Sequence, residues 1–415
     1  MVLISEKNMI QFQSHNISLI SNNEVTPIID LGQHGFADTF YPKEQIEIAS
    51  NTAPLVCCLD KTTGLIQLQN ITLAKDRYDL IDYSYTSSNS EVSKLHWKEF
   101  FQSVTSKISL LGGSVLEIGS NDGYLLSLFK QRTKRVVGLD ASSVMVTKAK
   151  SLGIETIHGI FGETKDINSM AFEIGGKFNL ILANNVMNHA NDPLRFVKEV
   201  SYILDKEGTF VFEVPYWSNT ISSLRFDQIY LEHITYFTVE SLEFLLKTAG
   251  LYINEVELVD YHGGSLRVYA SFKKACSENK SKFISMEESL KLKDEKTYIL
   301  YMEKINLLKG KFFENLEISI RHKISPTVFG IGAAAKANTL LTYFGLNYLH
   351  IDFIVDSSPF KQNKITPVSL IPIKNDEILT DIPNGIGIIL AWNLSGTLKN
   401  KLLKINSGLE FLDIL

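Results

Sequence analysis

The sequence contains few cysteines and no long apolar segment, and each absence excludes a class of protein. Only three of its 415 residues are cysteines. Two of them, Cys57 and Cys58, are adjacent, so reduced thiols are a simpler interpretation than a disulfide framework. No stretch approaches about 18 uninterrupted apolar residues, which disfavours a membrane-spanning helix. The first residues do not show the basic and apolar regions of a secretory signal, and we therefore expect a cytoplasmic protein.

The chain also lacks a strong charge of either sign. Its formal net charge is −5, which gives no reason to expect a nucleic acid or an anionic membrane surface as a partner. Hydrophobic residues make up 45% of the chain and charged residues 21%, as in ordinary globular proteins. A chain of this length suits two or three domains.

Strand-like and helix-like segments alternate through the middle of the chain, beginning with SVLEIGS, GYLLSLFKQ and RVVGLDA. This alternation predicts a parallel, doubly wound sheet, and the continuous apolar strands predict burial on both faces. A lysine-rich helical connector precedes a second pattern of this kind, TVFGIGAAAKANTLLTYFG. The predicted fold class is α/β, with a Rossmann-like central domain and a second Rossmann-like domain at the C-terminus. We place a small short-stranded domain at 1–72, the central domain at 73–275 and the C-terminal domain at 276–415.

A glycine-containing turn, in VLEIGSNDGYLL, joins the first strand and helix of the central pattern. Its glycines allow a sharp bend and the close approach of a ligand, although a tight turn without a ligand would also use them. Asp140 closes the next strand, where a carboxylate can accept hydrogen bonds from two ribose hydroxyls. The turn carries Glu117, suited to an amino group, and lacks GxGxxG, so it resembles the first motif of Rossmann-like methyltransferases. The predicted S-adenosylmethionine-binding residues are Glu117, Gly119, Ser120, Asn121, Gly123, Asp140 and, unless they only terminate a strand, Asn184 and Asn185.

The segment FDQIYLEHITYF brings proton-transfer groups together after the strand GTFVFEVP. It contains Tyr230, Glu232, His233 and Tyr236, and we expect it at the same sheet edge as the cofactor turn. A histidine titrates near neutral pH, and a neighbouring carboxylate or tyrosine can fix its tautomer. A helix with a buried, hydrogen-bonded histidine would be the alternative without catalysis.

A second polar segment, YHGGSLRVY, follows it and contains His262 and Arg267. Two glycines permit close approach of the backbone, and an arginine can bind a phosphate or carboxylate through two parallel hydrogen bonds. The alternative is a hairpin turn with a surface arginine.

The order of these segments resembles the sugar C-methyltransferases that act on dTDP-linked 4-keto sugars, over nearly the whole chain. The most specific matches are YLEHITYF and AAAKANTLL. Shorter matches are IIDLG, GLIQL, YSYTSSNS, LANNVMNH and HGGSLR. The resemblance implies S-adenosylmethionine as methyl donor, S-adenosylhomocysteine as product, a dTDP-linked 4-keto-6-deoxy sugar as substrate, methylation at C3 and a monomeric state.

The resemblance also implies roles for individual residues. His233 corresponds to the family's base, with Glu232 and Tyr230 supporting it or binding the sugar. His189 corresponds to another active-site histidine of the family. The remaining predicted substrate contacts are Tyr83 or Tyr85, between which the sequence does not choose, Tyr236, His262, Arg267 and, at the C-terminal glycine turn, Lys336 and Asn338.

Two departures from the family pattern affect these expectations. The family's first domain binds zinc through two CxxC pairs, but the corresponding regions here read QFQSHNISL and CCLDKTTG. A structural zinc needs four ligands, so we predict no metal and a domain held by its own packing. The second departure is Ala337, where the family usually has glycine.

A sugar carbon becomes nucleophilic only after losing a proton, and a ketone on the adjacent carbon makes that proton removable. The chemistry therefore needs a base, donors for the oxyanion and alignment with the methyl group. We predict His233 as the base, with Tyr230, His189 or a water near the oxyanion.

The alternatives to this function are an O- or N-methyltransferase, a non-catalytic nucleotide-binding protein and a nicotinamide oxidoreductase. The last is kept open only by the GIGAAAK turn.

Overall fold

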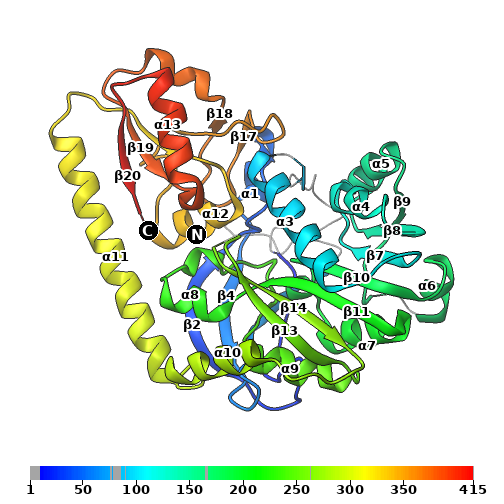
Figure 1. Cartoon of the computed structure of the whole chain (residues 1–415). Coiled ribbons are helices and arrows are strands. Elements are labelled where there is room, and N and C mark those ends of the chain that lie inside the picture. The colour runs from blue at the N-terminus through cyan, green and yellow to red at the C-terminus, as the bar shows by residue number, and fades with distance from the viewer. Residues whose placement is uncertain are drawn as a thin grey trace.

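The computed structural model describes residues 10–74, 77, 86–88, 90–163, 167–261 and 263–414 (Figure 1). Three predicted substrate contacts, Tyr83, Tyr85 and His262, lie outside these residues. Within the described ranges, no helix is long and apolar enough to cross a membrane.

The central part contains a seven-stranded sheet with the order β13-β14-β11-β10-β7-β8-β9. Its parallel strands are β7 (Ser114–Ile118), β8 (Arg135–Asp140), β9 (Glu155–His158), β10 (Phe178–Asn184) and β11 (Leu204–Pro215). β13 (Tyr252–Val259) and β14 (Ser265–Ser271) form a hairpin, and β14 pairs antiparallel with β11. The sequence predicted only the parallel part. The connection between β13 and β14 is too short for a parallel crossover, which explains the reversal.

Helices cover both faces of this sheet, as the apolar strands predicted. One face packs against α3 (Glu91–Lys107), α4 (Tyr124–Phe129) and α5 (Ser143–Ser151). The other packs against α7 (Pro193–Ile203) and α9 (Val239–Thr248). The Asp192 side chain accepts a hydrogen bond from the backbone N–H of Arg195 and so caps the start of α7.

The N-terminal part forms a four-stranded antiparallel sheet with the order β12-β5-β4-β2. Three strands, β2 (Thr26–His34), β4 (Ala53–Leu59) and β5 (Ile66–Leu68), come from the first part of the chain. The fourth, β12 (Thr235–Tyr236), comes from the predicted proton-transfer segment. The N-terminal sheet and that segment are therefore one hydrogen-bonded unit.

The N-terminal sheet has apolar packing at Cys57, in the CCLDKTTG region that corresponds to the family's second zinc-binding pair. Cys57 and Cys58 are buried free thiols on β4, and Cys57 packs in the same apolar core as Leu55 and Leu59. Among the residues that the structure describes, no group of three or more His, Cys, Asp or Glu side chains is arranged to hold a metal. The absence of zinc stays a prediction.

The C-terminal part contains a five-stranded parallel sheet with the order β18-β16-β15-β19-β20. Its strands are β15 (Val328–Ile331), β16 (Phe353–Val355), β18 (Ile373–Lys374), β19 (Ile386–Ile389) and β20 (Glu410–Asp413). α12 (Ala335–Phe344) follows the glycine turn after β15, and α13 (Ser395–Ile405) precedes β20. β17 (Lys364–Ile365) pairs with β3 (Tyr41–Pro42) and so joins this part to the N-terminal one.

The lysine-rich connector forms two helices, α10 (Glu278–Ser289) and α11 (Glu295–Arg321), and not one. The chain breaks between them because Lys291 has a positive φ of 52° and Asp294 caps the start of α11. α11 runs along the outside of the molecule and links the central and C-terminal parts (Figure 1).

Candidate active site

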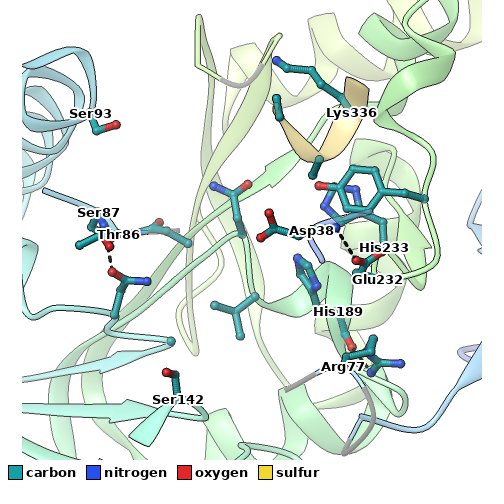
Figure 2. A pocket seen from close by; sticks show the side chains of 18 of the residues that line it. Asp38, Arg77, Thr86, Ser87, Ser93, Ser142, His189, Glu232, His233 and Lys336 are labelled. Atoms are coloured by element: carbon teal, nitrogen blue, oxygen red, sulfur yellow. Dashed lines mark hydrogen bonds between the residues drawn. The ribbon is translucent and has the colours of Figure 1, made fainter. Parts of the chain in front are cut away.

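A cavity of about 820 Å³ lies where the three parts of the chain meet (Figure 2). Its floor is the carboxyl end of the central sheet, where ligands of open α/β sheets bind. The N-terminal part contributes the loop between β2 and β3, and the C-terminal part contributes the turn after β15. One cavity therefore offers space for a cofactor and for a second molecule.

Most of the predicted cofactor residues line this cavity. They are Glu117, Gly119, Asn121, Asp140, Asn184 and Asn185. Ser120 does not line it, because its side chain packs against Gly138 of β8. Gly123 does not line it either and acts at the start of α4, where it has a φ of 77°.

Gly119 satisfies two constraints that exclude larger residues. Its φ is 70°, a left-handed conformation that glycine adopts without strain. A Cβ at this position would lie 2.3 Å from Cγ2 of Val186, which lines the same cavity. The glycine therefore fixes the turn and keeps its cavity side open.

Glu117 has the electrostatics of a binding site for a cation. Its side chain is buried, and Oε2 has no hydrogen-bond partner among the described residues. Burial, followed by the charges of Asp122 and Asp140, raises the pKa of the Glu117 carboxyl well above its ordinary value. A buried carboxylate without a partner is unfavourable, and a bound ammonium group would remove that cost. The amino group of S-adenosylmethionine fits this need.

Asp140 is oriented by the backbone of both neighbouring loops. One carboxylate oxygen accepts from the N–H of Asn121 and the other from the N–H of Ser142, each at 2.8 Å. Burial raises the pKa of Asp140, and these two hydrogen bonds oppose the shift. Each oxygen keeps a second lone pair, so the carboxylate can still accept from two ribose hydroxyls.

Sequence reasoning missed the segment that covers the cofactor turn. The side-chain oxygen of Asn121 accepts from the N–H of Ser87 at 2.9 Å, and Asp122 Oδ2 accepts from the N–H of Ser88 at 3.1 Å. Thr86 and Ser87 line the cavity (Figure 2). The signal in the sequence is the polar YSYTSSNS stretch, in which the family resemblance points only to the tyrosines.

The turn after β9 was also missed as part of the site. Residues 159–163 line the cavity and follow the end of β9 at His158. Gly162 has a φ of 83°, which ends the extended conformation. The two glycines of GIFG, Gly159 and Gly162, were the available signal for a turn at this position.

The tautomer of His233 is set by a backbone carbonyl. Its Nδ1 lies 3.1 Å from the carbonyl oxygen of Gln228, which can only accept, so Nδ1 carries the proton. Nε2 is then the nitrogen that holds the lone pair. The ring packs against Tyr230, with centroids 3.8 Å apart, and lies 4.9 Å from the ring of His189. All three residues line the cavity, and both histidines are drawn there in Figure 2.

His189 is held neutral in the same wall. Burial lowers its pKa to about 3, with a further contribution from the positive charge of Arg77. Arg77 also donates to the backbone carbonyl of His189 at 3.1 Å and so fixes its position. The Nδ1 atom of His189 has no hydrogen-bond partner among the described residues. A neutral imidazole with an unpaired ring nitrogen can form a hydrogen bond with a polar substrate.

Glu232 and Tyr236 position this segment. Glu232 Oε1 accepts from the backbone N–H of Asp38 at 2.8 Å, which ties the segment to the N-terminal loop. Burial raises the pKa of Glu232 to about 7, while the backbone hydrogen bonds of Asp38 and Ala37 oppose the shift. Tyr236, predicted as a substrate contact, does not line the cavity; its hydroxyl accepts from the backbone N–H of Tyr230 at 3.1 Å.

Of the remaining predicted substrate contacts, one lines the cavity and two lie in the protein interior. Lys336 lines the cavity, and burial lowers its pKa to about 8 against the opposing effect of Asp227. Asn338 does not line it and donates to the carbonyl of Ala37 at 2.6 Å. Arg267 does not line it either, since its guanidinium is buried against Glu213 at 2.7 Å. Arg267 therefore stabilises the sheet interior.

Comparisons with known proteins agree with the two α/β parts. Residues 95–256 match a methyltransferase domain, and residues 260–412 match a C-methyltransferase C-terminal domain. The C-methyltransferase NovU of Streptomyces niveus is 30% identical over 315 residues, which cover 75% of this chain and 74% of that protein. The chain belongs to the S-adenosylmethionine-dependent C-methyltransferase family. The predicted Rossmann-like fold, enzyme class and cofactor are thereby confirmed.

More distant similarities cover smaller shares of this C-methyltransferase. The ubiquinone biosynthesis O-methyltransferase of Xanthomonas campestris pv. campestris is 23% identical over 106 residues, 26% of this chain and 44% of that protein. A solved S-adenosylmethionine-dependent methyltransferase from Clostridium acetobutylicum is 16% identical, with a TM-score of 0.36 over 45% of this chain and 94% of that chain.

Replacement of Gly119 by alanine tests the cofactor turn. We expect Gly119→Ala to weaken S-adenosylmethionine binding by about 10-fold or more, because the left-handed backbone is strained and the added methyl group meets Val186. Calorimetric titration measures the dissociation constant. Gly310→Ala on α11, where a Cβ meets nothing, is the matched control. Wild-type affinity in Gly119→Ala would contradict this site.

The raised pKa of Glu232 predicts a pH-dependent stability. Ionisation of this carboxyl opposes folding, and the penalty is absent below its ordinary pKa and complete above about pH 7. Relative to wild type, Glu232→Gln should therefore gain unfolding free energy as the pH rises from about 5 to about 8, by up to roughly 3 kcal/mol. Denaturant titration at several pH values measures the difference, with the exposed Glu303→Gln as control. A difference that does not change with pH would contradict the assignment.

Proposed function

We propose that this C-methyltransferase methylates C3 of a dTDP-linked 4-keto-6-deoxy sugar after removing the proton next to the ketone. The observation that carries the proposal is the tautomer of His233. Its Nδ1–H donates to the carbonyl of Gln228, so Nε2 is a lone-pair nitrogen in a cavity wall that also holds the neutral His189. Carbon methylation needs such a base, since the carbon is nucleophilic only after deprotonation.

The protein's residues have separate roles in the proposed step. His233 Nε2 takes the proton from C3, and the electron pair of the broken C–H bond moves toward the ketone oxygen as an enolate. Tyr230, whose ring packs on His233, lies in the same wall and supports the developing oxyanion through its hydroxyl. Glu232 and Tyr236 position the segment by their hydrogen bonds to the backbone. S-adenosylmethionine, when bound, supplies the methyl group as a sulfonium and leaves as S-adenosylhomocysteine.

The shape and charge of the cavity support a substrate with a nucleotide attached. The same cavity continues from the histidine pair to the C-terminal glycine turn, where Lys336 and Lys361 line it. Lysine side chains and a helix start are suited to phosphate groups. A sugar at the histidines and a diphosphate near Lys336 would use the whole space beside the cofactor.

Methyl transfer to a keto-sugar nucleotide tests the proposal directly. We expect the purified chain with S-adenosylmethionine and dTDP-4-keto-6-deoxyglucose to give a product heavier by one methylene unit and an equal amount of S-adenosylhomocysteine. dTDP-glucose, which has no ketone, should give neither product. Mass spectrometry measures both species. Equal methylation of dTDP-glucose would indicate a hydroxyl acceptor and overturn carbon methylation.

The role of His233 is tested by a variant that keeps its size and polarity. We expect His233→Asn to lower kcat by roughly 10²- to 10⁴-fold, the usual contribution of a general base, with S-adenosylmethionine affinity unchanged. Steady-state assay and calorimetry separate the two effects. His322→Asn, at the exposed end of α11, is the matched control. Turnover by His233→Asn close to that of wild type would remove this residue from the mechanism.

A further inference from the structure

One acidic residue in the cavity has no part in the proposed reaction. Asp38 lies in the loop between β2 and β3 of the N-terminal part, and it lines the cavity that holds the two histidines. Figure 2 shows its carboxylate turned toward the open space. The sequence did not single it out, because it is one aspartate in the loop GQHGFADTF.

The backbone beside Asp38 is fixed by both of the other parts of the chain. Its N–H donates to Glu232 of the central part at 2.8 Å. The carbonyl of the preceding residue, Ala37, accepts from Asn338 of α12 at 2.6 Å. The N-terminal loop is thus held in one position relative to His233 and to the C-terminal turn.

The carboxylate itself has no hydrogen-bond donor among the residues that the structure describes. Lys361 is the neighbouring positive charge, but its Nζ donates to the carbonyl of Ala333 at 2.7 Å and lies 4.9 Å from the ring centre of Phe40. Burial raises the pKa of Asp38, and the charge of Lys361 opposes that shift. Asp38 is half-buried and its carboxylate faces the cavity, so a ligand bound there can supply the donor that the described residues do not.

The charge of Asp38 restricts which part of a ligand can lie next to it. Phosphate groups would be repelled by the carboxylate, and Lys336 provides positive charge at another part of the cavity (Figure 2). Glu232, whose charge interacts with that of Asp38, is adjacent in sequence to His233. The position therefore suits the sugar ring better than the diphosphate.

We propose that Asp38 determines substrate specificity by accepting a hydrogen bond from a hydroxyl or ammonium group on the ring of the keto-sugar. This inference rests on the proposed function and adds a recognition element to it. A carboxylate that the bound substrate covers is left unpaired by an analogue without the donor, so the site rejects that analogue. It also gives the N-terminal part a direct place in the active site.

Two substitutions at Asp38 separate the two kinds of donor. Asp38→Ala removes the acceptor, so KM for dTDP-4-keto-6-deoxyglucose should rise by about 10- to 100-fold. Asp38→Asn keeps an acceptor oxygen without the charge, so a hydroxyl donor predicts a much smaller rise than in Asp38→Ala. A counterpart sugar with an amine in place of a ring hydroxyl tests the other donor, for which both variants should lose affinity to a similar extent.

The controls separate recognition from folding and from the proposed function. Glu44→Gln changes the same charge on the exposed surface of the N-terminal part and should leave KM unchanged. S-adenosylmethionine affinity should not change in Asp38→Asn, and its thermal unfolding midpoint should not fall. A wild-type KM in Asp38→Ala, or an equal loss of cofactor and sugar affinity in both variants, overturns the inference.

If the wild type transfers no methyl group to the keto-sugar, the proposed function is overturned, and binding decides the role of Asp38 separately. Calorimetric titration of the same sugar nucleotide in the presence of S-adenosylhomocysteine measures that binding. Weaker binding by Asp38→Ala than by Glu44→Gln supports the contact. Equal binding overturns it.

Discussion

The segment 226–237 is held by hydrogen bonds from all three parts of the chain, and the geometry of the proposed active site depends on them. The carbonyl of Ile229 accepts from the Thr339 hydroxyl of the C-terminal part at 2.9 Å. Glu232 accepts from the N–H of Asp38 in the N-terminal part, and β12 extends the N-terminal sheet. A histidine whose tautomer and orientation are fixed before the substrate arrives loses little freedom in the reaction. The three parts are therefore one functional unit.

Several buried groups around the cavity lack partners, and together they indicate what the cavity binds. Asp38 is half-buried and turns its carboxylate toward the cavity. Glu117 has an unpaired buried oxygen and His189 an unpaired buried ring nitrogen among the described residues. In a protein interior each such group is unfavourable by itself. Their placement, with Glu117 at the cofactor turn and the other two near His233, corresponds to two ligands side by side. Unpaired buried groups therefore mark the proposed binding site.

The sequence predicted those features of the fold that depend on local patterns. Alternating strands and helices and the glycine turn follow from neighbouring residues, and the structure shows each of them. It did not predict the pairing of β14 with β11, the pairing of β12 with the N-terminal sheet or the position of Asp38 in the cavity, because these depend on contacts between distant segments. Arg267 was selected for its chemistry, yet its partner Glu213 lies on another strand. The type of a residue indicates which chemistry its side chain can perform. Contacts between distant segments decide whether that side chain faces a ligand or the protein interior.

Proton exchange at the sugar carbon is the most direct test of the account, because it isolates the step assigned to His233 from methyl transfer. The protein would be incubated in heavy water with dTDP-4-keto-6-deoxyglucose and S-adenosylhomocysteine, and deuterium at the carbon next to the ketone would be measured by mass spectrometry. The account predicts incorporation faster than the uncatalysed rate with the wild type, and its loss with His233→Asn. The account would be contradicted if the wild-type protein methylated this sugar without catalysing exchange. Equal exchange by His233→Asn and the wild type would also contradict it.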